Sequence, residues 1–395
     1  MAIATLVVLA AFLSYGYVAY TKKATAYPEL RDIASHQRDF NELRDYFQDI
    51  AEKKGALYAY EILRRVDLPP KTDVHLLGHV IGDQLYKEYG KDAISYCTSE
   101  FRNACSHTVV VGLMLDYGEA ATNDIQAACK KAPGGLGAYT MCFHGLGHGI
   151  LAFTDYNLEK TIALCKKTAT AEYDRQEFGQ CVGGAVMETI SGGGHNPGIW
   201  ASMRPHYLYA ADPLYPCDAA FMPAEVKTYC YSYITPHLIE VAGGDMNSPN
   251  PAVYPKAFSY CRVLAPNDPD RNTCVASFGK EILNYARQSD RRTVVTITDE
   301  EFERMGQWCA LSGNEHDTTL CLLSVLHSIY WGGENEPQVS VRYCHVLANK
   351  NKEYGDACVD DLAHLMARYA PKSEEREPLC KLLPEDAQTI CRGAK

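Results

Sequence analysis

The histidines of this chain are concentrated and regularly spaced. Of the thirteen, five lie in two His-x-x-x-His pairs and one position between them: His75, His79, His107, His144 and His148. Residues four apart share one face of a helix, with Cβ atoms about 5–6 Å apart. Such a pair can hold one metal ion, as in the His-Glu-x-x-His zinc helices. The spacing therefore predicts a metal site with these five side chains as ligands.

One carboxylate belongs to the same pattern. Glu188, in the segment VMETI, lies one residue beyond the slot of His148 when the repeated cysteines described below are aligned. We expect it to be the catalytic residue. Imidazoles with a carboxylate suit zinc, iron or copper, and the set could hold zinc with an open position for an activated water, or iron for oxygen chemistry. Axial ligation of a non-covalent haem by two histidines is the less favoured alternative.

The elements that position these histidines follow the cysteines. The sixteen cysteines form eight neighbouring pairs, separated by 8 residues (Cys97 to Cys105) at the closest and by 16 (Cys165 to Cys181) at most. No Cys-x-x-Cys occurs, which argues against zinc-ribbon and thioredoxin-like sites. We expect eight short-range disulfides, which persist in an oxidising compartment. The body of the protein should therefore be extracytoplasmic: periplasmic, extracellular or lumenal.

A repeat runs in step with the cysteines. Segments that begin at the second cysteine of a pair, such as CFHGLGHGILAF and CVGGAVMETI, carry apolar residues at helical spacing, and a second helix follows several of them. Successive second cysteines lie from 33 residues (Cys358 to Cys391) to 49 residues (Cys181 to Cys230) apart, which is the period of helical solenoids. The pattern predicts an all-α fold, an α-solenoid of disulfide-stapled helical hairpins similar to tetratricopeptide or HEAT repeats.

The N-terminal region is expected to direct export. Residues 2–20 carry no charge and are just long enough to span a bilayer. We expect residues 1–26 to be a signal anchor or a signal peptide, so a single-pass membrane tether and a cleaved leader both stay open. Residues 27–72 contain two or more helices that should cap the array.

The rest of the chain divides into two parts. Residues 73–216 hold the histidine-rich repeats and end in a long connection, 191–216, which we expect to cover the site as a lid. Residues 217–395 hold the C-terminal disulfide-stapled repeats. Their single histidines should line the same concave surface: His237, His327 and His364.

Charge and composition limit the partners. The net charge of −11 and the lack of a basic stripe argue against a nucleic acid held by its phosphates. Tyrosine is abundant, with 27 residues against 11 phenylalanines. Because tyrosine favours half-buried positions, this composition suggests a groove that could dock a protein or peptide.

The histidine segments resemble a known family. The succession His-x-x-Gly-His, Cys-Ser-His, Cys-Phe-His-Gly-Leu-Gly-His-Gly and Cys-Val-Gly-Gly-Ala-Val-Met-Glu, over roughly residues 73–191, is similar to a family of uncharacterised exported bacterial and archaeal proteins. His107 is followed by Thr where that family's pattern has Gly. The resemblance implies no activity, only that these positions form one unit. At fold level, helical repeats with paired histidine and acidic ligands also resemble the HEAT-repeat di-iron hydroxylases, by analogy alone.

The leading interpretation is an exported metal-dependent enzyme, either hydrolytic or oxidative. Two alternatives stay open. In the first, the protein is a non-catalytic scaffold whose concave groove docks a protein or peptide, and the histidines are structural. In the second, it stores or delivers a metal or haem.

Overall fold

The computed structural model describes most of the chain, namely residues 27–35, 39–69, 72–133, 135–170, 176–192, 197–245, 250–266, 268–287, 294–332, 337–370 and 372–393. Within these ranges every regular element is a helix, and an isolated β bridge joins Tyr209 and Asp212. The all-α expectation is confirmed. The apolar segment expected at 2–20 lies outside the described residues. Among the residues that are described, no helix is both long and apolar enough to cross a membrane.

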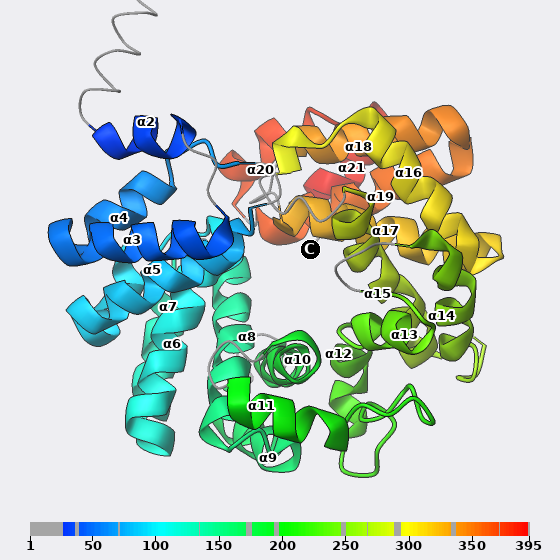
Figure 1. The fold of residues 1–395 in the computed structure, drawn as a ribbon. Helices are drawn as coiled ribbons and strands as arrows, with labels where there is room; N and C mark the ends of the chain where they lie inside the picture. The colour runs from blue at the N-terminus through cyan, green and yellow to red at the C-terminus, as the bar shows by residue number, and fades with distance from the viewer. Residues whose placement is uncertain are drawn as a thin grey trace, which may run out of the picture.

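An inner layer of helices follows the chain around a central space, and each helix contacts a neighbour in the layer (Figure 1). It consists of α5 (Val74–Tyr89), α6 (Ala104–Tyr117), α8 (Gly135–Phe153), α10 (Gln176–Ser191), α12 (Lys227–Tyr231), α13 (Thr235–Val241), α15 (Pro269–Ala286), α17 (Glu315–Gly332) and α19 (Lys352–Tyr369). Intervening helices pack between neighbours of this layer: α7 (Thr122–Lys131), α9 (Leu158–Thr168), α14 (Tyr254–Cys261), α16 (Asp299–Cys309) and α18 (Pro337–Lys350).

The two ends of the described chain add short helices to this arrangement. At the N-terminal end α2 (Pro28–Ser35) precedes α3 (Phe40–Lys54) and α4 (Ala56–Leu63), and both α3 and α4 pack on α5. At the C-terminal end α20 (Ser373–Cys380) and α21 (Glu385–Gly393) pack on α19. The inner layer also closes on itself, because the short helix η2 (Phe101–Asn103) contacts α8 and α17, and α19 contacts α8.

Local sequence signals set the ends of the helices that carry the histidines. Asp73 caps α5, since its carboxylate accepts a hydrogen bond from the amide of Leu76 at 3.1 Å. The same helix ends at Gly90, and α6 ends at Gly118, with φ of 58° and 56°. This left-handed backbone suits glycine, which has no Cβ. The start of α5 and the ends of α5 and α6 are therefore set by residues that are recognisable in the sequence.

The eight neighbouring cysteine pairs all form disulfides, and no cysteine is free. They are Cys97–Cys105, Cys129–Cys142, Cys165–Cys181, Cys217–Cys230, Cys261–Cys274, Cys309–Cys321, Cys344–Cys358 and Cys380–Cys391. In six of them an intervening or terminal helix is joined to the helix that follows it, as α7 is to α8. Each short loop should stabilise the fold by about 2–3 kcal/mol. The bonds indicate an oxidising, extracytoplasmic compartment.

Glycines allow the inner helices to approach closely. A Cβ added at Gly147 in α8 would overlap the carbonyl oxygen of Cys181 in α10, and one added at Gly184 in α10 would overlap the carbonyl oxygen of His144. Gly145 faces the backbone and ring of His107 in the same way. These glycines cost helix propensity, about 1 kcal/mol each relative to alanine. Close packing of α6, α8 and α10 offsets that cost.

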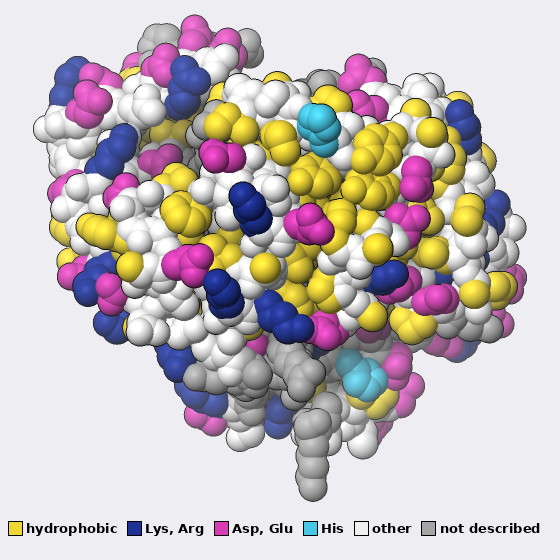
Figure 2. Space-filling model, turned by 90° about the horizontal axis from the view of Figure 1, so that it is seen from below, with side chains coloured by type: hydrophobic (Ala, Val, Ile, Leu, Met, Phe, Trp, Pro, Cys, Tyr) yellow, Lys and Arg dark blue, Asp and Glu magenta, His cyan; other side chains and the backbone are white. Residues whose placement is uncertain are grey.

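The surface of the molecule has a mixed character. On the face seen from below in Figure 2, basic and acidic side chains are interspersed around a gathering of hydrophobic ones. Large hydrophobic side chains that are exposed include Leu115, Tyr117 and Phe153. This face has no basic stripe of the kind that holds nucleic-acid phosphates.

Gly147→Ala should destabilise the fold because the added Cβ cannot fit against Cys181 unless α8 and α10 move apart. Overpacking of this kind costs about 1–3 kcal/mol, measured by denaturant unfolding of the oxidised protein. Gly306→Ala is the matched control. It lies inside α16 with no atom nearer than 3.9 Å to the added Cβ, so helix propensity should leave it equally or more stable. Equal stability of both variants would contradict the close packing.

Candidate metal centre in the central cavity

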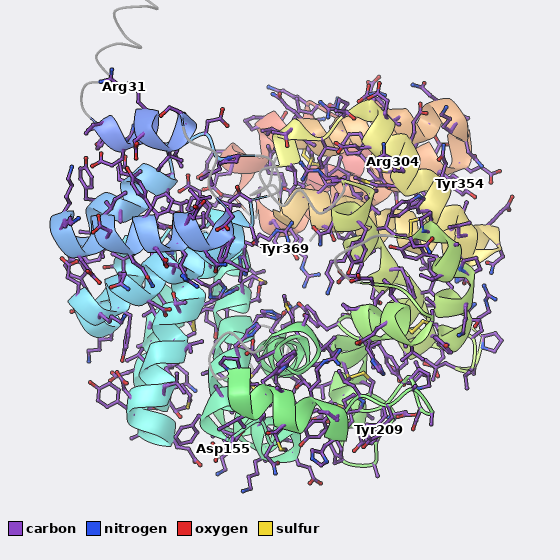
Figure 3. All side chains as sticks on the ribbon, viewed as in Figure 1. Arg31, Asp155, Tyr209, Arg304, Tyr354 and Tyr369 are labelled. Atoms are coloured by element: carbon purple, nitrogen blue, oxygen red, sulfur yellow. A yellow bond between two sulfur atoms is a disulfide. The ribbon has the colours of Figure 1, made fainter. Side chains whose placement is uncertain are left out.

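The inner layer surrounds a cavity of about 1540 Å³. Side chains from all its helices, α5 to α19, contribute to the lining. Figure 3 shows Tyr369, from the last of them, at the edge of the central space, whereas Arg31, Asp155 and Tyr354 lie at the periphery. The cavity is lined by all five predicted histidine ligands and by Glu188. The structure therefore brings together residues that are far apart in the sequence.

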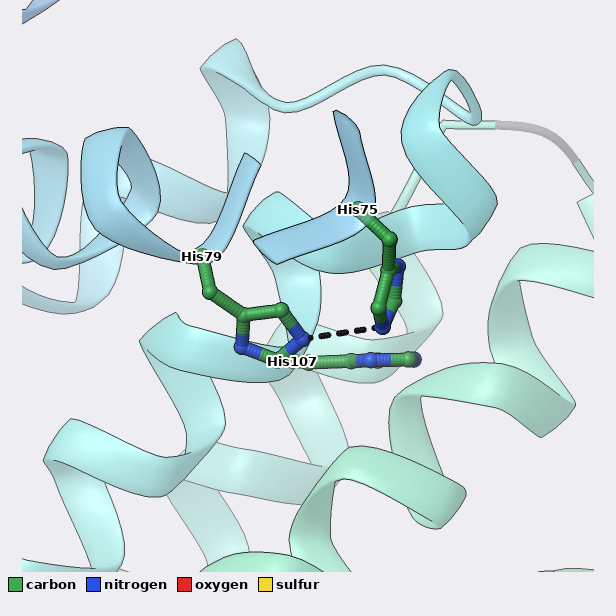
Figure 4. A group of neighbouring side chains, drawn as sticks. All are labelled: His75, His79 and His107. Carbon is green, nitrogen blue, oxygen red and sulfur yellow. Dashed lines mark hydrogen bonds between the residues drawn. The ribbon is translucent and has the colours of Figure 1, made fainter. Parts of the chain in front are cut away.

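Three of the histidines converge on one point. Each of His75, His79 and His107 offers a ring nitrogen, and the three nitrogens lie within 4.8 Å of one another (Figure 4). The Nε2 atoms of His75 and His79 are 3.1 Å apart. Two imidazole nitrogens bound to one tetrahedral ion at about 2.0–2.1 Å would lie roughly 3.3 Å apart. The spacing of this pair is close to what a shared ion requires.

His107 is the member of this triad without a protein partner. Its side chain is 2% exposed, and both ring nitrogens are buried with no hydrogen-bond partner among the described residues. A buried polar group in that state costs about 1–3 kcal/mol. An ion bound to the triad would satisfy one of these nitrogens and remove part of the cost.

Backbone and side-chain acceptors orient the neighbouring rings. His75 Nδ1 donates to the carbonyl oxygen of Phe101 at 2.6 Å, and His148 lies with Nδ1 2.9 Å from a carboxylate oxygen of Glu188. The other oxygen of Glu188 accepts a hydrogen bond from the hydroxyl of Tyr156 at 3.0 Å. Rings that donate from Nδ1 leave Nε2 free as a ligand or base. Metal-binding histidines are commonly held by carbonyl or carboxylate partners of this kind.

His144 and His148 form a second pair beside the triad. Their ring centres are 5.0 Å apart, and those of His144 and His107 are 5.8 Å apart. The Nδ1 atom of His144 lies 3.3 Å from the hydroxyl of Tyr233. The five rings thus form one continuous cluster, in which His107 links the pair on α5 to the pair on α8.

Burial keeps three of the five rings neutral, those of His75, His107 and His144. It lowers the pKa of His75 to about 4, from the ordinary 6.5. Burial lowers the pKa of His107 and His144 well below 6.5, and neighbouring histidines lower it further. A neutral imidazole has a free lone pair, which is the form that binds metal. These three rings therefore have free lone pairs at neutral pH.

A left-handed turn supports the site at η2. Phe101, Arg102 and Asn103 have φ of 57°, 55° and 60°. Such a conformation costs a residue with a Cβ about 1–2 kcal/mol. The turn presents the Phe101 carbonyl to His75 and places Arg102 and Asn103 in the cavity lining. Backbone strain at a functional site is a recurrent feature of proteins.

Sequence reasoning assigned no role to several polar groups of the lining, among them Asp83, Tyr233 and Lys280. Asp83 follows His79 by four residues on α5, so the stripe that holds His75 and His79 continues to it. The side chain of Asp83 is exposed to the cavity, but partial desolvation by the surrounding protein raises its pKa to about 6. The helical spacing was a usable signal for Asp83. Tyr233 and Lys280 had none, because they come from later helices.

Some expectations were wrong. Of the later histidines, His327 lines the cavity, but His237 is buried outside the lining and His364 is exposed. Whether a side chain faces the cavity depends on how its helix is rotated about its own axis. The number of residues between the side chain and the repeat cysteine determines that rotation only loosely.

In the connection 191–216, Ser191 and Gly192 line the cavity, whereas residues from 197 onward pack on the end of α10. Trp200 donates to the carbonyl of Thr189 at 3.0 Å, and Arg204 donates to the carbonyl of Ile190 at 3.1 Å. These bonds satisfy the last carbonyls of α10, which have no partner within the helix. None of the described residues 197–216, which include α11 (Pro197–Met203), lines the cavity.

Comparison of the chain with protein-family models, with curated proteins and with solved structures finds no match in any of the three. The case for a function therefore depends on the geometry of the cavity.

The metal-free protein should lose stability as the pH falls from about 6.5 to about 4. The unfolded chain binds protons on its histidines near pH 6.5, whereas burial keeps His75, His107 and His144 neutral in the fold. Each such histidine lowers the free energy of unfolding by up to about 1.4 kcal/mol per pH unit. Asp83, with its raised pKa, acts in the opposite direction.

Denaturant unfolding at a series of pH values would measure this effect. Comparison of the wild type with His144→Gln separates the histidines from the carboxylates, because the variant lacks one histidine proton and should have the shallower profile. Identical profiles would show that His144 is not kept neutral by burial.

Proposed function

We propose that this protein is an extracytoplasmic metal-dependent hydrolase whose ion is bound by His75, His79 and His107. The observation that carries the proposal is the convergence of these three rings in the wall of the cavity, within 4.8 Å. The lack of any described protein partner for His107 supports it.

The donor set fits a transition metal. Neutral imidazoles bind zinc, copper or iron, and three protein ligands leave a coordination position open, as in the three-histidine catalytic zinc sites. An ion there would act as a Lewis acid that polarises a water or a substrate oxygen. The cavity of about 1540 Å³ gives room for a substrate beside the triad.

The second histidine pair supplies acid–base groups. His148, held through Nδ1 by Glu188, can accept a proton at Nε2, and the carboxylate would stabilise the resulting imidazolium. In this arrangement Glu188, expected from the sequence as the catalytic residue, has a positioning role. A carboxylate-held imidazole favours proton transfer, and with it hydrolysis. Iron or copper at the triad would favour the oxidative alternative.

The finer architecture belongs to the same proposal. We take the helix pairs to be repeats of one hairpin, in an α-solenoid that closes around the cavity. Gly147 and Gly279 each follow a repeat cysteine by five residues, and each packs on the carbonyl of the cysteine that begins the next hairpin, Cys181 or Cys321. An N-terminal membrane tether, expected from residues 2–20, stays a prediction.

A scaffold remains the second candidate. Tyr229, Tyr233 and Tyr369 line the cavity, and tyrosine side chains are frequent anchors for peptides. In that case the five histidines would be structural and no ion would be needed.

His107→Leu should abolish metal retention without destabilising the metal-free protein. The substitution removes a ligand and also removes a buried polar group that lacks a partner, so the free energy of unfolding should stay equal or rise by about 1 kcal/mol. The full chain, exported to an oxidising compartment and purified without chelator or histidine tag, would be measured by metal mass spectrometry and denaturant unfolding. His364→Leu, at an exposed position, is the control.

One equivalent of metal in the wild type and in His364→Leu, and almost none in His107→Leu, is the expected result. Equal metal contents in all three proteins, or no metal in any after reconstitution with zinc, copper or iron, would refute the proposed site and favour the scaffold.

Glu188→Gln should separate metal binding from catalysis. The amide can still contact His148 but no longer stabilises its protonated form, so kcat should fall by about 10²–10⁴, the range for general acid–base catalysis. The readout is turnover of a panel of esters, amides and phosphoesters by the metal-loaded protein. Metal content should be unchanged. A protein that stores metal would show no turnover, and Glu188→Gln would then have nothing to alter.

A further inference from the structure

The cavity wall next to the histidine cluster carries two cations. Lys280, on α15, lies with Nζ 4.0 Å from the ring centre of Tyr233, the residue whose hydroxyl contacts His144. Arg102, on η2, lines the same cavity directly after Phe101, the residue that holds His75. The two cations thus approach the cluster from different helices.

The surroundings of Lys280 show that the two cations act on each other. Lys280 Nζ lies 3.4 Å from a carboxylate oxygen of Glu281 and 3.2 Å from the carbonyl oxygen of Ser232. Burial lowers the pKa of Lys280, and the positive charge of Arg102 lowers it further. The two cations therefore repel each other in this part of the cavity, and a bound anion would relieve that repulsion.

A buried polar atom of the same cavity wall has no hydrogen-bond partner among the described residues. The side chain of Asn103 lines the cavity, its residue is 4% exposed, and its Oδ1 is buried without a hydrogen-bond partner among the described residues. Asn103 directly precedes α6, the helix that carries His107. The two ends of an amide exchange by a half-turn, so Asn103 can offer a donor to a bound anion.

We propose that Arg102, Asn103 and Lys280 form an anion-binding subsite beside the histidine triad, and that the substrate carries a carboxylate or phosphate group. That the anion is part of a substrate rests on the proposed function, whereas the binding of the anion itself does not. The anionic group is held by the ammonium, the guanidinium and the amide, as charge-assisted hydrogen bonds to oxyanions commonly are. The rest of the substrate then lies against the triad, where His148 faces it.

The backbone strain of η2 is consistent with this role. Three consecutive left-handed residues are retained where they place Arg102 and Asn103 in the cavity and the Phe101 carbonyl on His75. The same turn contacts α8 and α17 and so helps to close the inner layer. A single turn therefore connects the closure of the fold, the orientation of one ligand and the anion subsite.

Calorimetric titration of the metal-free full chain with inorganic phosphate, and separately with acetate, tests the subsite. Chloride at matched ionic strength is the reference. The metal-free state excludes direct binding of phosphate to an ion. Lys280→Met should raise the Kd for the preferred anion at least about tenfold, and Asn103→Asp, which tolerates the left-handed backbone and adds a negative charge, should do the same. Lys166→Met, an exposed lysine paired with Glu225, should leave the Kd unchanged.

Metal content of every variant, measured in parallel, separates the two proposals. Anion binding that is lost in Lys280→Met and Asn103→Asp while zinc is retained supports the subsite. Anion binding that is absent in the wild type, or that is equal in all three variants, overturns it, even if the triad binds metal. Failure of the triad to bind metal, with anion binding still dependent on Lys280, would reject the hydrolase and leave the subsite standing.

Discussion

The close approach of neighbouring inner helices is the constraint on which the site depends. Gly145, Gly147 and Gly184 leave no room for a Cβ between α6, α8 and α10. At this spacing the histidine rings of adjacent helices come within 5.8 Å, measured between the centres of His107 and His144. A wider helix spacing would separate the rings, and the five imidazoles of α5, α6 and α8 would no longer form one cluster.

Burial of the rings means that their nitrogen atoms need hydrogen-bond partners, and the histidines differ in whether they have one. A polar group removed from water needs a partner, and His75, His144 and His148 find theirs in a carbonyl, a hydroxyl and a carboxylate. His107 has no such partner among the described residues. A cluster that was purely structural would gain stability from an apolar residue there, whereas a metal ligand has to keep a nitrogen free.

The disulfides and the cavity are linked through the connectivity of the chain. Each inner helix from α6 onward, apart from α13, contains a cysteine that forms a disulfide with a cysteine of the preceding segment. Covalent closure of these short loops limits sliding of one helix along the next. The polar wall of a cavity of about 1540 Å³ contributes less to stability than a packed core would. Stabilisation by disulfides therefore suits a fold that surrounds a cavity.

The sequence by itself determined the features that are local. Cysteine spacing predicted all eight disulfides, the period of the apolar residues predicted helices, and the i, i+4 spacing placed His75 with His79 and His144 with His148, because these relations need only one helix or one short loop. Only the tertiary structure decided how the helices turn around the cavity. Rotation of each helix, and closure through η2, brought Lys280 and Tyr233 to the cluster, kept His237 out of the lining, and set Trp200 and Arg204 on the end of α10 instead of over the site. Those placements depend on packing between segments that are distant in the chain, and no local spacing encodes them.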